Sequence, residues 1–106
     1  MSRRIMRMIV FFDLPMTTDK DLAEYRRFRK FLLLNGFIMM QQSVYSKLVL
    51  NNNSTKLMRN QLVKNLPRTG LVQVMQVTEK QYTEIEYLVG GAQTKIIDST
   101  DRVVSI

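Results

Sequence analysis

The 106-residue sequence contains no cysteine, no histidine and no tryptophan. The absence of cysteine excludes disulfides, zinc–thiolate sites and thiol catalysis within this sequence. The absence of histidine removes the side chain that most often serves as a general base near neutral pH and as a metal ligand. Acid–base chemistry near neutral pH would therefore have to come from other groups.

Long apolar runs are lacking as well. Arg3, Arg4 and Arg7 lead into an apolar run that ends after five residues at Asp13. That run is too short for the hydrophobic region of a signal peptide, and no small-residue cleavage site follows it. No segment approaches the ~20 apolar residues of a membrane span. We therefore expect a soluble, cytoplasmic protein without a membrane partner.

Acidic residues are scarce, and none occurs between Tyr25 and Thr78. Residues 1–70 carry 13 basic and 4 acidic side chains (+9), and residues 71–106 carry 3 and 5 (−2), which gives the net charge of +7. This asymmetry indicates a surface for a polyanion. Nucleic acid is favoured because each neutralised phosphate releases counterions and adds affinity. The alternative is a basic surface that only keeps the protein soluble.

Hydrophobic periodicity predicts six elements in the order strand, helix, strand, strand, helix, strand. They cover about residues 5–13, 18–34, 37–40, 44–50, 55–66 and 71–77. We expect Thr17 or Thr18 to cap the first helix, and Asn53 or Ser54 to cap the second, which buries Met58, Leu62 and Leu66. This order is typical of an α+β, ferredoxin-like βαββαβ sandwich, with residues 1–78 as its core.

Residues 79–106 form an extension that this core does not require. Thr78 and Gln81 resemble a capping box, and Tyr82, Ile85 and Val89 predict a short helix that ends at Gly90–Gly91. Two extended pieces follow, at residues 94–98 and 102–106. We expect a C-terminal strand here that pairs with an exposed sheet edge for dimer or partner contact.

Several short motifs follow one another along this frame. Phe12-Asp13 closes the first strand, and an arginine-rich helix runs through residues 25–30 to Gly36. Gln41, Ser43, Val44 and Tyr45 come next. In this order the motifs resemble, over essentially the whole chain, the small Cas2 proteins of CRISPR spacer acquisition, also known as CRISPR-associated endoribonucleases. The variety that accompanies Cas9-type effectors is the most similar.

The resemblance implies a homodimer in which two Asp13 residues approach a common axis and bind Mg²⁺ or Mn²⁺. It also implies a metal-dependent endonuclease activity on RNA or DNA. A second implied role is architectural: the dimer bridges dimers of the Cas1 integrase and carries the double-stranded DNA that becomes a spacer. Single-stranded RNA is the alternative ligand. Many relatives have tyrosine where this chain has Phe12, so one hydroxyl near the metal site is missing.

The residues themselves leave the role of Asp13 open. A carboxylate at the end of a rigid strand can hold a divalent cation, but a turn aspartate commonly bonds its own backbone. Mg²⁺ requires six oxygens, so a second carboxylate would have to come from a two-fold mate. Ser43 could orient water at this metal or satisfy the hairpin backbone, and Phe12 and Tyr45 are candidate supporting residues.

Arg26, Arg27 and Lys30 follow Glu24 without a further acidic partner on the first helix. Like charges crowded on one helix destabilise it unless an anion lies across them. We therefore predict phosphate contacts by these three residues and by Arg3, Arg4 and Arg7, although an ordinary solvated face is the simpler alternative. An RNA-recognition module on the same fold is disfavoured because its basic-Gly-aromatic signature is absent. A scaffold and a nuclease would share the same residues, so the sequence does not separate them.

Overall fold

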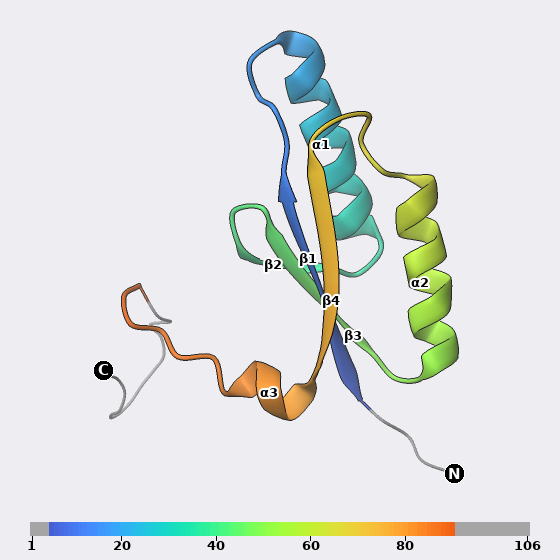
Figure 1. The fold of residues 1–106 in the computed structure, drawn as a ribbon, viewed down its shortest axis with the longest axis vertical. Helices are drawn as coiled ribbons and strands as arrows, with labels where there is room; N and C mark the ends of the chain where they lie inside the picture. Colours follow the sequence, from blue (N-terminus) through green and yellow to red (C-terminus); the bar gives the residue numbers. More distant parts are fainter. Residues whose placement is uncertain (1–4, 91–106) are drawn as a thin grey trace.

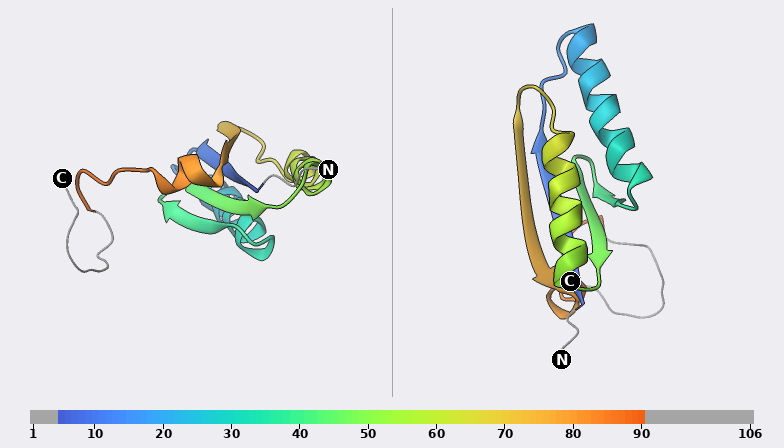
Figure 2. Two further views of the ribbon diagram at one scale, coloured as in Figure 1. Left: turned by 90° about the horizontal axis from the view of Figure 1, so that it is seen from below. Right: turned by 90° about the vertical axis from the view of Figure 1, so that its right-hand side faces the viewer.

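The computed structural model describes residues 5–90 and confirms the ferredoxin-like fold (Figure 1). The elements are β1 (Met6–Asp13), α1 (Asp19–Leu34), β2 (Ile38–Gln41), β3 (Val44–Val49), α2 (Asn52–Lys64), β4 (Leu71–Thr78) and α3 (Glu79–Thr83). The four strands form one antiparallel sheet in the order β2-β3-β1-β4. Helices α1 and α2 lie on one face of this sheet (Figure 2).

Strand β1 lies at the centre of the sheet and is the most deeply buried element. It pairs with β3 and β4 over most of its length, from Met6 opposite Val49 and Thr78 onward. Met8 and Val10 are fully buried on the helix side, and Ile9 is only 7% exposed on the other side. The dense apolar run was therefore a correct sign of a buried central strand.

The boundaries of α1 agree with the predicted caps. The Thr18 hydroxyl accepts a hydrogen bond from the Asp21 amide at 3.0 Å, and the Asp21 carboxylate accepts one from the Thr18 amide at 3.1 Å. This capping box satisfies two amides that the helix leaves unpaired. At the other end Gly36 has φ +89°, a left-handed conformation that glycine adopts without strain.

Helix α2 begins earlier than predicted, because Asn51 is its cap rather than Asn53 or Ser54. The Asn51 side chain accepts a hydrogen bond from the Ser54 amide at 2.8 Å. Each of three successive asparagines could cap a helix, and the first does so because β3 ends just before it. Met58 and Leu62 are buried as predicted, but Leu66 lies beyond the end of the helix and is exposed.

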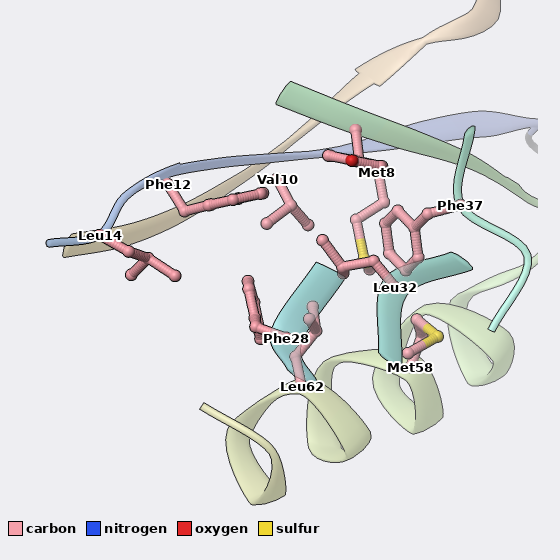
Figure 3. Packing of buried hydrophobic residues seen from close by; sticks show 10 residues of the cluster. Met8, Val10, Phe12, Leu14, Phe28, Leu32, Phe37, Met58 and Leu62 are labelled. Atoms are coloured by element: carbon pink, nitrogen blue, oxygen red, sulfur yellow. The ribbon is translucent and has the colours of Figure 1, made fainter. Parts of the chain in front are cut away.

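The core lies between the sheet and the two helices. Met8, Val10 and Phe12 project from β1 towards Phe28 and Leu32 of α1 (Figure 3). Met58 and Leu62 of α2 complete the cluster. These are the two buried residues of α2, so the helix packs on the core through them.

Helix α3 is shorter than predicted. Its capping box between Thr78 and Gln81 is confirmed, but the helix ends at Thr83 instead of Gly90. Ile85 and Val89, expected on its apolar face, lie after it and are exposed, Val89 by 92%. The predicted extended pieces at 94–98 and 102–106 fall outside the described residues. No helix within residues 5–90 is long and apolar enough to cross a membrane.

Candidate nucleic-acid interface and carboxylate site

Asp13 is the last residue of β1 and is exposed. Side chains alternate along a strand, so Asp13 lies on the same sheet face as Ile9 and Phe11, opposite the helices. The end of β1 is held on two sides: the Phe12 amide donates to the Ser43 carbonyl at 3.0 Å, and Asp13 pairs with Leu71 of β4. The structure therefore presents this carboxylate on a rigid support at the open face of the sheet.

The three predicted supporting residues do not gather around this carboxylate. Phe12 and Tyr45 lie in the core on the helix side of the sheet, where their rings stack with centroids 5.7 Å apart. Ser43 occupies the β2–β3 turn with φ +67°, and it contacts β1 through its carbonyl. A tyrosine hydroxyl at position 12 would thus extend from a core ring, on the face away from Asp13.

One chain supplies only part of a metal site. Within residues 5–90 no group of three or more carboxylates could hold an ion together. Mg²⁺ normally takes one or two carboxylates and completes its six oxygens with water and substrate phosphates. As a single carboxylate, Asp13 could supply one of these oxygen ligands, and the others would have to come from water, substrate or a second chain.

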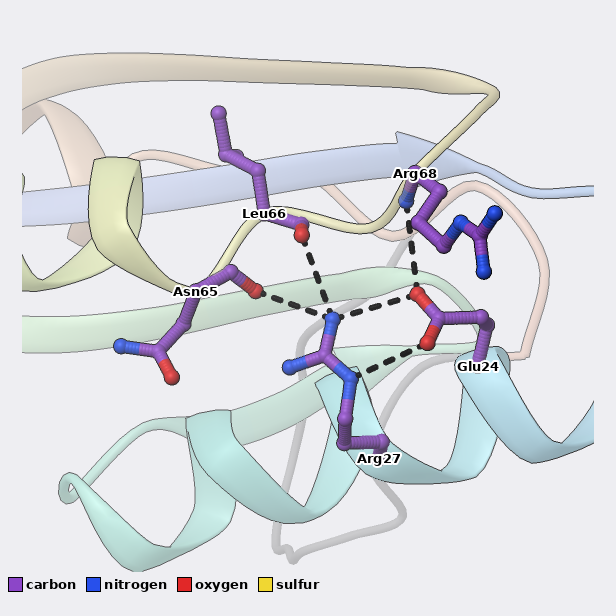
Figure 4. A network of polar contacts seen from close by, with 5 residues as sticks. All are labelled: Glu24, Arg27, Asn65, Leu66 and Arg68. Carbon is purple, nitrogen blue, oxygen red and sulfur yellow. Dashed lines mark hydrogen bonds and ion pairs between the residues drawn. The ribbon is translucent and has the colours of Figure 1, made fainter.

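Arg27 is paired with Glu24, the acidic residue three positions before it on α1. Its guanidinium forms two hydrogen bonds with Glu24, at 3.2 and 3.3 Å, and also donates to the carbonyls of Asn65 and Leu66 (Figure 4). These bonds hold the pKa of the Glu24 carboxyl below its usual range. Arg27 therefore ties α1 to the end of α2, where the helix dipole favours a cation.

Arg7 is engaged in a similar way on the other face of the sheet. Its guanidinium forms a bidentate pair with Glu79, at 3.0 and 2.8 Å, and lies 4.1 Å from the centroid of the Tyr82 ring. The pair raises the pKa of Arg7 and lowers that of Glu79. Arg7 thus fastens α3 to β1. Arg3 and Arg4, the other predicted contacts near it, lie outside the described residues.

Arg26 and Lys30 are the other two residues of α1 that were predicted to contact phosphate. They are one helical turn apart on α1, both are exposed, and neither has an acidic partner among residues 5–90. Helix α2 adds exposed cations that the sequence interpretation did not assign, Lys56 and Arg59. Both cations belong to the stretch without acidic residues between Tyr25 and Thr78. Only the fold, however, shows that α2 lies beside α1 (Figures 1 and 2).

The face of the sheet opposite α1 and α2 is apolar. Its exposed side chains share the orientation of Ile9, according to the strand register, and are Ile38, Leu48, Leu71 and Met75. At its centre Ser46 is fully buried, and its hydroxyl has no hydrogen-bond partner. Several large apolar side chains on one sheet face are typical of a protein–protein contact.

Comparison with known proteins identifies the family. A family model described as CRISPR associated protein Cas2 matches residues 6–85. A CRISPR-associated endoribonuclease Cas2 of Treponema denticola is 48% identical over 99 residues, covering 93% of this chain and 98% of that protein. A protein of the same name from Lacticaseibacillus rhamnosus is 42% identical over 101 residues, covering 95% and 100%. The chain therefore belongs to the CRISPR associated protein Cas2 family.

Proposed function

We propose that this Cas2 chain forms a homodimer that binds duplex DNA and bridges dimers of the Cas1 integrase during spacer acquisition. The duplex would lie on the layer formed by α1 and α2, called the helix layer below. The proposal rests on the chemical difference between the two faces of the chain. Exposed cations that have no acidic partner within residues 5–90 lie on α1 and α2, whereas the opposite sheet face exposes large apolar side chains. Each face fits a different partner, and both can be occupied at once.

The apolar face supports the dimer. Leu71 and Met75 of β4 are about half exposed, as is Ile38 at the other edge of the sheet. A second copy that stacks its own sheet on this face would remove these side chains from water, which contributes about 25 cal/mol per Å² of apolar area. Asp13 lies on the same face, so such a dimer would bring two carboxylates into one interface.

The helix layer supports duplex binding. Arg26 and Lys30 would contact the phosphate backbone, which positions a duplex without recognising its sequence. Two chains carry twice the net charge of +7, about +14, which favours electrostatic steering of a long polyanion. The Cas1 contact is proposed from the family, with residues 79–106 as its expected location.

A second candidate function is a Mg²⁺- or Mn²⁺-dependent nuclease at the paired Asp13 residues. It is favoured by the exposed position of Asp13 and by the name endoribonuclease borne by the relatives. A cation there would stabilise charge that develops on a phosphodiester. Asp13 of each copy would hold it, and without histidine we expect cleavage to increase with pH and to show no mid-range imidazole titration.

A titration of Mg²⁺ and Mn²⁺ with RNA and duplex DNA separates the two functions. Wild type, Asp13→Asn and the control Asp19→Asn, an exposed carboxylate on α1, are compared for cleavage and for binding in parallel. The scaffold predicts salt-sensitive duplex binding by all three proteins and no cleavage that depends on Asp13. Cleavage that disappears only in Asp13→Asn, with binding retained, would instead establish the nuclease.

A further inference from the structure

A small pocket lies between the loop after β1, the start of α1 and the loop before β4. Its volume is about 160 Å³, and its lining includes Leu14, Pro15, Lys20, Asp21, Pro67 and Arg68. Both prolines of the chain are among these residues. Proline has a fixed φ, so two of the pocket walls are stiff.

The two carboxylates that line the pocket, Asp21 and Glu24, already accept hydrogen bonds from within the protein. One oxygen of Asp21 accepts the amides of Thr17 and Thr18, at 3.2 and 3.1 Å. Both oxygens of Glu24 are bonded, to the Arg27 guanidinium and, at 3.3 Å, to the Arg68 amide. The second oxygen of Asp21 accepts no hydrogen bond from residues 5–90 and is therefore a free acceptor on a residue that lines the pocket.

The two cations that line the pocket are available to a ligand. Lys20 and Arg68 are exposed, and their side chains form no ion pair within residues 5–90. Since Arg27 neutralises Glu24, these two cations outnumber the one remaining carboxylate, Asp21. The pocket therefore combines an apolar slot, one acceptor and a net positive charge, which suits a ligand with a flat ring and an anionic group.

The size of the pocket limits that ring. A protein cavity of roughly 150 Å³ is known to hold one benzene molecule, so a volume of 160 Å³ accommodates one six-membered ring, whereas a bicyclic purine would protrude. A carboxylate acceptor such as Asp21 pairs with the amino group of cytosine and has no donor to pair with on the corresponding edge of uracil. Lys20 and Arg68 would then bind a phosphate.

We propose that this pocket binds a single cytidine nucleotide, with its base between Pro15 and Pro67 and its phosphate against Lys20 and Arg68. Such a nucleotide could belong to an unpaired strand end. The site is distinct from the Arg26 and Lys30 row, and it is complete in one chain. The proposal can therefore be tested independently of dimer formation and of duplex binding.

The test is a titration of the ¹⁵N-labelled protein with cytidine 5′-monophosphate, followed by amide chemical shifts. Uridine and adenosine monophosphates and inorganic phosphate are titrated separately. We expect saturable shifts at Leu14, Lys20 and Thr69, with weaker binding of the other three probes. The double variant Lys20→Gln/Arg68→Gln should bind cytidine monophosphate at least about tenfold more weakly, since charge-assisted bonds are lost. The control Lys80→Gln, which removes an exposed cation from α3, should bind as wild type does.

Three results would overturn the proposal. One is the absence of saturable shifts at the pocket residues. Another is an equal affinity for inorganic phosphate or for uridine monophosphate, which would show that the base is not recognised. The third is undiminished binding by Lys20→Gln/Arg68→Gln. Both positions are exposed, so the double variant is expected to fold, and its thermal unfolding is measured alongside.

Discussion

The Arg7 guanidinium joins the first strand to the last described helix through two hydrogen bonds to Glu79, at 3.0 and 2.8 Å. Tyr82 lies under the same guanidinium. Replacing Arg7 by Met keeps an unbranched side chain but removes both contacts. We expect α3 to open more often while the core stays intact. Hydrogen exchange should become several-fold faster at residues 79–83 and remain unchanged in β1 and β3. Unchanged exchange in α3 would show that packing alone holds it.

The same pair predicts a pH dependence. The Arg7 guanidinium lowers the pKa of the Glu79 carboxyl from its usual value of 4.5. A depressed carboxyl pKa stabilises the docked helix above pH 4.5, and this stabilisation is lost as the pH falls through the lower, folded pKa. Titration of the Glu79 carboxyl by ¹³C NMR should give a lower midpoint in wild type than in Arg7→Met. Identical midpoints would mean that the pair is not formed in solution.

Tyr45 is fully buried, and its hydroxyl has no hydrogen-bond partner. An unsatisfied buried hydroxyl destabilises the folded state, so its removal should help. We predict that Tyr45→Phe raises the free energy of unfolding in urea by about 1 kcal/mol, because the ring stacked on Phe12 is retained. A loss of stability would show that the hydroxyl forms a bond in solution, for example to a buried water.

Gly70 directly precedes β4 and lies close to the backbone of Asp13 at the end of β1. A Cβ atom there would lie 2.8 Å from the Asp13 carbonyl oxygen, and φ is +99°. Gly70→Ala should therefore destabilise the fold by about 1–3 kcal/mol. Gly90→Ala is the matched control, because its φ is also positive but nothing lies within 4 Å. Equal losses in the two variants would contradict a specific contact with the end of β1.

The local signals in this sequence predicted the fold well. The cap at Thr18, the Thr78 capping box and the Gly36 stop depend on neighbouring residues only, and the structure contains all three. The start of α2 was missed because three asparagines compete for the cap, and the end of β3 decides between them. The end of α3 was missed because Gly90 suggested a longer helix than its exposed side chains could stabilise.

The contacts of the candidate site were harder to predict from the sequence than the fold. The carbonyl partners of Arg27 just after α2 and the partner of Arg7 on α3 are distant in sequence, so these contacts could not be foreseen from charge patterns. The pairing of Arg27 with Glu24, three residues before it, could have been foreseen. The positions of Phe12 and Asp13 could have been foreseen. Adjacent residues in a strand face opposite sides of a sheet, and Phe12 belongs to the core.

The most direct test of the proposed function is the salt dependence of duplex binding. The logarithm of the association constant should fall linearly with the logarithm of salt concentration, with a slope of about −0.9 for each phosphate contact. Arg26→Gln/Lys30→Gln removes two cations per chain, hence four per dimer, and should make the slope shallower by roughly 3 to 4. The control Lys80→Gln, on α3 outside the helix layer, should leave it unchanged. A slope that is the same in wild type and Arg26→Gln/Lys30→Gln would contradict duplex binding through the helix layer.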